Sequence, residues 1–150
     1  MRILKSQAGK PYLDFTGPRT IRRGQYLRIV NRTSPRAVGP HTFSLVPKYL
    51  HPDTKQERRK CFEGGPGHIC FEIGNWHGVE EDGSRINFNP AKAGRAGWDR
   101  EGTLRRKGDS WFSGGEGSSF GQRVTAPVGT NLSYLCAIHP NMQGNIRVVR

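Results

Sequence analysis

Hydrophobic and polar positions alternate in the first third of the chain, as they do in short β-strands. Residues 20–31 (TIRRGQYLRIVN) hold two such stretches separated by a glycine, which predicts strand, turn and strand. In residues 41–47 (HTFSLVP), Phe43 and Leu45 fall on one face, while Val46 and two hydroxyl side chains fall on the other. The pattern predicts a third strand there.

The carboxyl-terminal end repeats this pattern. Residues 120–126, 132–136 and 145–150 are predicted strands, and residues 127–130 (PVGT) form a turn between the first two. Many short strands joined by Gly/Pro turns are typical of an all-β sandwich or barrel. We therefore expect a single all-β domain over residues 1–150, since a chain of this length closes one core.

The middle of the chain, about residues 49–108, lacks this alternation and is rich in Gly, Pro, Asp, Asn and Arg. It has one predicted helix, over residues 52–60 (PDTKQERRK), with Pro52 in the first turn. A loop of this length is uncommon in a compact domain unless it is functional or pinned. We expect an irregular insertion that carries one short helix.

Two cysteines, Cys61 and Cys70, lie within this insertion. A disulfide between them would close a loop of ten residues and contribute about 2.5–3 kcal/mol on the chain-entropy basis. Two independent buried thiols are the alternative. We favour the disulfide, which implies an oxidising compartment.

The net charge of the chain indicates what kind of partner it binds. The chain has 150 residues, 24 Lys or Arg, 12 Asp or Glu and a formal net charge of +12, and its first 60 residues hold 14 basic and 3 acidic side chains. Basic clusters at 22–23, 58–60 and 105–107 would suit phosphate groups, but no aromatic residues are interleaved with them as a base-stacking groove requires. We favour a solvated basic face that attracts an acidic partner over binding of nucleic acid.

The third cysteine, Cys136, is the first candidate for a metal ligand. Cys136 ends a predicted strand, and His139 and Met142 follow at intervals of three in the segment YLCAIHPNMQG. Pro140 disfavours a helix at His139, so we expect a strand, a tight loop and a returning strand. Such a loop can aim a thiolate, an imidazole and a thioether at one point. Two histidines, one cysteine and a weak axial methionine are the ligands of a blue-copper centre.

A second imidazole must come from elsewhere in the chain. His41 opens a well-patterned strand, whereas His51, His68 and His77 lie in the irregular middle, so His41 is the best candidate. Taken singly, each ligand has an ordinary explanation, with Cys136 as a small buried hydrophobe. Their joint spacing between two strands favours a copper site.

These segments resemble the cupredoxins, in particular plastocyanin, pseudoazurin and amicyanin. The resemblance covers residues 20–46 and 120–149, and the short loop from Cys136 to Met142 is most similar to that of amicyanin. It implies a Greek-key β-sandwich and one copper ion that cycles between Cu(I) and Cu(II). It also implies that His41 and His139 are equatorial ligands, with Cys136 as the thiolate and Met142 as the axial ligand.

The resemblance further implies a surface through which the electron leaves. His139 would present its far ring edge there, framed by Pro40, Ile138 and Pro140. The family usually has Asn directly after the first histidine, where its side chain ties the two ligand loops together, but this chain has Thr42. We expect the Thr42 hydroxyl to form a shorter version of that link, and Pro40 and Pro140 to stiffen the ligand loops beside it.

The function that follows is single-electron transfer between redox partners, with copper sequestration or delivery as the alternative. A basic binding module on the same sandwich is disfavoured because the ligand spacing is intact. The flanks of Cys136 are Leu135 and Ala137, without the adjacent histidine of multicopper oxidases, and we expect no enzymatic activity.

The expected partner is an acidic redox protein, and the chain itself is expected to be a monomer without a transmembrane segment. The first residues turn polar after four positions and hold no signal-peptide core. We expect an extracytoplasmic location, periplasmic, secreted or at the cell surface, with the export signal absent from this sequence, and a cytosolic chain is the alternative.

Overall fold

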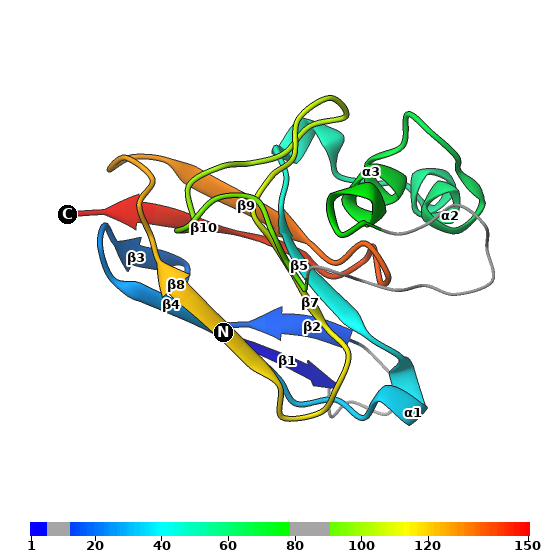
Figure 1. Cartoon of the computed structure of the whole chain (residues 1–150), viewed down its shortest axis with the longest axis horizontal. Coiled ribbons are helices and arrows are strands. Elements are labelled where there is room, and N and C mark those ends of the chain that lie inside the picture. The colour runs from blue at the N-terminus through cyan, green and yellow to red at the C-terminus, as the bar shows by residue number, and fades with distance from the viewer. Residues whose placement is uncertain (6–12, 79–90) are drawn as a thin grey trace.

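The computed structural model describes residues 1–5, 13–78 and 91–150, in which two β-sheets pack against each other and two helices lie beside one of them (Figure 1). The helices of the described residues are α1 (Pro35–Val38), α2 (Lys55–Glu63) and α3 (Ile69–Trp76), with a 3-10 turn at Lys48–Leu50. None of them is long and apolar enough to cross a membrane.

The smaller sheet has four strands in the order β2-β1-β4-β8. Its strands are β1 (Arg2–Lys5), β2 (Leu13–Thr16), β4 (Tyr26–Asn31) and β8 (Ser119–Arg123). Strand β1 pairs antiparallel with β2 and parallel with β4. The sheet is therefore mixed.

The larger sheet has six strands in the order β3-β10-β9-β5-β7-β6. Its strands are β3 (Thr20–Arg22), β5 (His41–Leu45), β6 (Lys92–Ala93), β7 (Ser110–Ser113), β9 (Asn131–Leu135) and β10 (Gln143–Val149). Strand β5 pairs antiparallel with β9, and β9 pairs antiparallel with β10. This pairing places the start of β5 beside the β9–β10 hairpin.

Aromatic side chains fill the core between the sheets. Phe43 of β5 is fully buried, and its ring centroid lies 5.6 Å from Phe15, 5.2 Å from Trp98 and 4.9 Å from Tyr134. The contacts with Phe15 and Trp98 are edge-to-face, and such contacts stabilise a core beyond the area that they bury. The predicted inward face of β5, with Phe43 and Leu45, is confirmed.

A second cluster covers the outer face of the six-stranded sheet. Ile69, Ile73 and Trp76 lie on one face of α3 and pack against Val46 and Leu135. Because α3 covers this face, all five residues of β5 are buried. A strand buried on both sides holds its side chains firmly, which positions the residue at its start.

The all-β sandwich is confirmed, but the prediction of one helix in the insertion is wrong. Helix α2 begins at Lys55, because the Thr54 hydroxyl accepts the Glu57 N–H at 3.1 Å while the Glu57 carboxylate accepts the Thr54 N–H at 2.9 Å. Pro52 therefore lies before the helix and not in its first turn. Helix α3 is additional.

The predicted disulfide is confirmed: Cys61 of α2 is bonded to Cys70 of α3. It joins the two helices that lie outside the sandwich. Part of the predicted insertion, residues 79–90, falls outside the described residues.

Candidate metal centre

His41 is the first residue of β5, and its side chain is fully buried. Helix α1 ends just before it, where Gly39 has φ 75° and donates its N–H to the Pro35 carbonyl at 2.9 Å. This left-handed conformation is one that glycine adopts without strain. The turn at Gly39 brings the chain back into the sheet with the imidazole at the end of the sandwich.

A hydroxyl group fixes the tautomer of His41. Thr33 Oγ1 lies 2.8 Å from His41 Nε2 and donates its single hydrogen to Asn31 Oδ1 at 2.7 Å. It therefore accepts from His41, whose Nε2 carries the proton. Nδ1 is therefore the nitrogen with the lone pair, and it faces Cys136 Sγ at 3.9 Å.

The late hairpin supplies two further groups. Cys136 directly follows β9, its N–H donates to the Met142 carbonyl at 3.0 Å, and the Met142 N–H donates to the His139 carbonyl at 2.8 Å. These bonds close the loop between β9 and β10. The tight loop predicted from Cys136 to Met142 is thus confirmed.

His139 has the same tautomer as His41. Its Nε2 lies 2.8 Å from the carbonyl oxygen of Val38, which can only accept, so Nε2 is the protonated nitrogen. Val38 belongs to α1, directly before the turn that leads to His41. The segment from Thr33 to Val38 thus supplies a hydrogen-bond acceptor for each of the two imidazoles.

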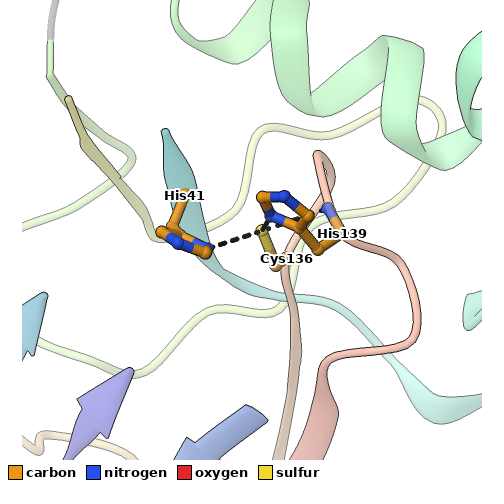
Figure 2. A group of neighbouring side chains, drawn as sticks. All are labelled: His41, Cys136 and His139. Atoms are coloured by element: carbon orange, nitrogen blue, oxygen red, sulfur yellow. Dashed lines mark hydrogen bonds between the residues drawn. The ribbon is translucent and has the colours of Figure 1, made fainter. Parts of the chain in front are cut away.

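The three donor atoms converge at the end of the sandwich (Figure 2). Cys136 Sγ lies 3.9 Å from His41 Nδ1 and 3.7 Å from His139 Nδ1, and the two ring centroids are 4.6 Å apart. His41 comes from β5, whereas the other two side chains come from the end of β9 and the loop that follows. Residues nearly a hundred positions apart therefore form one cluster.

The cluster meets the requirements of a metal centre. First-row ions bind nitrogen at about 2.0 Å and sulfur at about 2.3 Å, so two donors of one ion lie at most about 4.3 Å apart. Both nitrogen–sulfur distances are shorter than this limit. Both rings also donate their remote N–H to an oxygen, as metal-binding histidines usually do. A soft thiolate beside two imidazoles suits copper.

Burial keeps the Cys136 thiol protonated in the chain without a metal. The side chain is fully buried, which raises its pKa, while hydrogen bonds to the sulfur act against that rise. Among the donors are the Thr42 N–H at 3.3 Å and the His139 N–H at 3.4 Å. These N–H groups stabilise the thiolate that a metal ion needs.

The two imidazoles are neutral at pH 7. Burial, followed by the nearby His139, lowers the pKa of His41 to about 4. Burial also lowers the pKa of His139, although the hydrogen bond to the Val38 backbone acts in the opposite direction. Neutral rings present lone pairs without prior loss of a proton, so both are ready to bind a metal ion.

Thr42 links the two ligand segments, as expected. Its hydroxyl accepts the Ala137 N–H at 2.8 Å, and its own N–H donates to Cys136 Sγ. The hydroxyl also accepts from Ser44 at 3.1 Å, which in turn is bonded to Ser110. The position after His41 therefore ties β5 to the residue after Cys136 without an asparagine.

The remaining predicted residues have different environments. Met142, the last residue of the loop that begins at Cys136, is fully buried in the core between the sheets. Pro40, Ile138 and His139 are half-buried and reach the surface. Pro140 is buried, so its predicted place on the exit surface is wrong.

The other histidines do not join this centre. His51 bonds to the Val46 carbonyl and to Gln143, His77 bonds to Ser110, and His68 caps α3. The hydrogen-bond partners that orient His41 could not be found from the sequence. Thr33 contacts the ring through its hydroxyl, and Asn31 in turn accepts from that hydroxyl. Both residues lie at the end of another strand, and no spacing rule marks them.

No family model and no curated protein matches the sequence. A solved structure described as "Crystal structure of Na-dithionite reduced auracyanin from photosynthetic bacterium Roseiflexus castenholzii" is similar, with 17% sequence identity, a TM-score of 0.39 and coverage of 87% of this chain and 82% of that chain. The chain thus combines a two-sheet β fold with a Cys-His-His cluster that fits a type 1 copper site.

Proposed function

We propose that this chain is a type 1 copper protein that transfers single electrons between redox partners. His41, Cys136 and His139 would hold the ion, with the Met142 thioether as a further, weaker ligand. The observation that carries the proposal is the convergence of one sulfur and two Nδ1 atoms within 4.8 Å of one another, in a site where both rings have the right tautomer. Copper bound to such a set supplies a one-electron Cu(I)/Cu(II) couple.

The chain's own contribution is a set of ligands that do not rearrange. His41 is fixed by Thr33, His139 by Val38, and the thiol by two backbone N–H groups. Strand β5 is buried on both faces, so the ligand at its start has little freedom. Rigid donors lower the cost of reorganisation when the charge of the site changes, which favours an electron carrier over an enzyme.

His139 is the proposed route for the electron to the surface. Its ring is half-buried, with the half-buried Pro40 and Ile138 as apolar neighbours in the two ligand segments. A small apolar contact area allows a partner to approach the ring edge and to leave again quickly. The exit surface thus consists of Pro40, Ile138 and His139.

The proposed partner is an acidic redox protein. The net charge of +12 favours long-range attraction to an acidic surface and predicts that salt weakens the encounter. The disulfide supports an oxidising, extracytoplasmic location. We further propose that the carrier acts as a monomer, forms one domain and does not bind nucleic acid.

Addition of Cu(II) to the purified chain tests the proposal. We expect one equivalent to give an intense blue thiolate-to-copper band and an EPR spectrum with a narrow hyperfine splitting. Both features should be absent from Cys136→Ser. A colourless complex that matches that of the variant would overturn the proposal. A reversible voltammetric couple supports the carrier, whereas rapid loss of copper to a chelator supports delivery.

A further inference from the structure

A glutamine side chain joins the ligand loop to the segment that leads into the insertion helices. Gln143 is the first residue of β10 and directly follows Met142 in the chain. Its side-chain amide donates one hydrogen to the Pro140 carbonyl at 2.8 Å and the other to the Pro52 carbonyl at 3.0 Å. Pro140 is the residue after His139, so this amide is bonded directly beside a proposed copper ligand.

The two carbonyls fix the orientation of this amide. A carbonyl oxygen can only accept, so both hydrogens of the Gln143 amide are used and its oxygen, Oε1, is left to face His51. Oε1 lies 3.1 Å from His51 Nδ1. The other ring nitrogen, Nε2, lies 2.9 Å from the Val46 carbonyl oxygen. Both nitrogens of His51 therefore face an atom that can only accept.

Only the protonated ring of His51 satisfies both contacts. A neutral imidazole has one N–H and one lone pair, whereas the imidazolium has two N–H groups. In the neutral form a ring lone pair faces an oxygen lone pair, and the side chain is only 5% exposed, so water has little access to repair the contact. Uptake of a proton completes the bonds on both sides of the ring. We name His51 and Gln143 the His51–Gln143 pair.

The surroundings of His51 set the pH at which it gains this proton. Burial lowers the pKa of the ring, while its two hydrogen bonds act in the opposite direction. Lys48 and Asp53, which form an ion pair on the same segment, lower and raise the pKa respectively. Gln143, the contact from β10, carries no charge. The titratable groups that line the cavity beside the ring, from α2 and the residue before α3, are Glu57, Lys60 and His68. His51 is therefore neutral at pH 7 and takes up its proton at lower pH.

We propose that Gln143 is a positioning residue of the copper centre, and that a proton taken up by His51 tightens its hold on the ligand loop and raises the reduction potential. The inference rests on the proposed function, because it assigns a regulator to the same centre. Reduction adds one electron from the redox partner to copper, and the proton comes from water. A positive charge on His51 favours Cu(I), which carries one positive charge fewer than Cu(II). By linkage, the oxidation state of copper changes the proton affinity of His51 by the same factor.

Nuclear magnetic resonance of the metal-free chain tests the His51–Gln143 pair without copper. The ring resonances of His51, followed from about pH 8 to about pH 4, give its proton affinity in the parent chain and in Gln143→Leu. We expect the variant to bind the proton about tenfold more weakly, because the charged ring loses one hydrogen bond. The ring of His68, which lines the same cavity, is the internal control and should titrate alike in both chains. The Asn141 amide, in the ligand loop, should follow the His51 titration in the parent chain and not in His51→Gln. Equal proton affinities of His51 in the parent chain and Gln143→Leu would overturn the proposal.

Voltammetry of the copper-loaded chains tests the coupling to the centre. We expect the reduction potential to rise more steeply on acidification in the parent chain than in His51→Gln, which has no ring to protonate, and in Gln143→Leu, where the rise moves to lower pH. The other titrating groups, His139 included, are common to all three chains, so the difference between the profiles belongs to the His51–Gln143 pair. Parallel profiles in the parent chain and His51→Gln would overturn the proposal. A parent chain without a blue centre would refute the proposed function instead, and the titrations of the metal-free chain would still decide whether the pair acts on the ligand loop.

Discussion

Replacement of Thr33 by valine tests whether one hydroxyl prepares His41 for a metal ion. Thr33 is 5% exposed, and its Oγ1 is the acceptor for the His41 Nε2–H. Valine has nearly the same shape and keeps the buried methyl group, so the change removes the hydroxyl, with its hydrogen bonds to His41 and to Asn31 Oδ1, and little else. The Thr33 N–H still donates to Asn31 Oδ1, since that bond belongs to the backbone.

The expected cost follows from the burial of the ring. His41 is fully buried, so its N–H finds no water after the substitution, and a buried donor without a partner costs about 1–3 kcal/mol. The ring can also rotate or adopt the other tautomer. Loss of a group that orients a metal-binding histidine lowers metal affinity by about 10–100-fold. We expect both effects in Thr33→Val.

Thr33→Ser is the matched control, because it keeps the hydroxyl and loses the methyl group. Its cost should be about 1 kcal/mol of unfolding free energy, with copper affinity close to that of the parent chain. Denaturant unfolding of the metal-free chains and competition with a copper chelator measure the two quantities. Equal copper affinity in the valine and serine variants would refute the role assigned to the hydroxyl.

Three further predictions concern pH, the disulfide and the ligand link. Between pH 6.5 and about 4, His41 binds a proton in the unfolded chain but not in the folded chain. The unfolding free energy of the metal-free chain should therefore fall by up to about 3 kcal/mol as the pH is lowered over this range. A flat profile in denaturant titrations would contradict the lowered pKa of His41. Cys61→Ser with Cys70→Ser should lower the unfolding free energy by about 2.5–3 kcal/mol, because a loop of about ten residues is released; an unchanged denaturation midpoint would contradict this. Thr42→Val should leave the half-buried Ala137 N–H without its acceptor and shift the reduction potential measured by voltammetry, whereas Thr42→Ser should keep both the bond and the potential. Equal potentials in the two variants would show that the link does not affect the centre.

Two of the three ligands, Cys136 and His139, were predictable because they are close in the sequence. Cys136 and His139 stand on one short loop that Pro140 keeps out of a helix, so their proximity needs no knowledge of the fold. His41 was found from its place at the start of an alternating strand. Its approach to Cys136 depends on antiparallel pairing of β5 with β9, which a sandwich permits and the structure confirms.

Other features depend on contacts that a pattern does not encode. Helix α3 contains Gly74 and Asn75, which are weak helix formers, and it is stabilised by packing of Ile73 and Trp76 against the sheet. The burial of Pro140 depends on how the loop folds back. Such features follow from tertiary packing, so neither could be predicted from spacing or composition.

Copper X-ray absorption on the chain loaded with one equivalent of Cu(II) tests the central claim most directly. We predict one sulfur and two imidazole nitrogens in the nearest shell of ligands, with the sulfur lost in Cys136→Ser and one imidazole lost in His41→Ala. A shell of nitrogen and oxygen alone, or one that neither variant changes, would contradict a centre built from His41, Cys136 and His139.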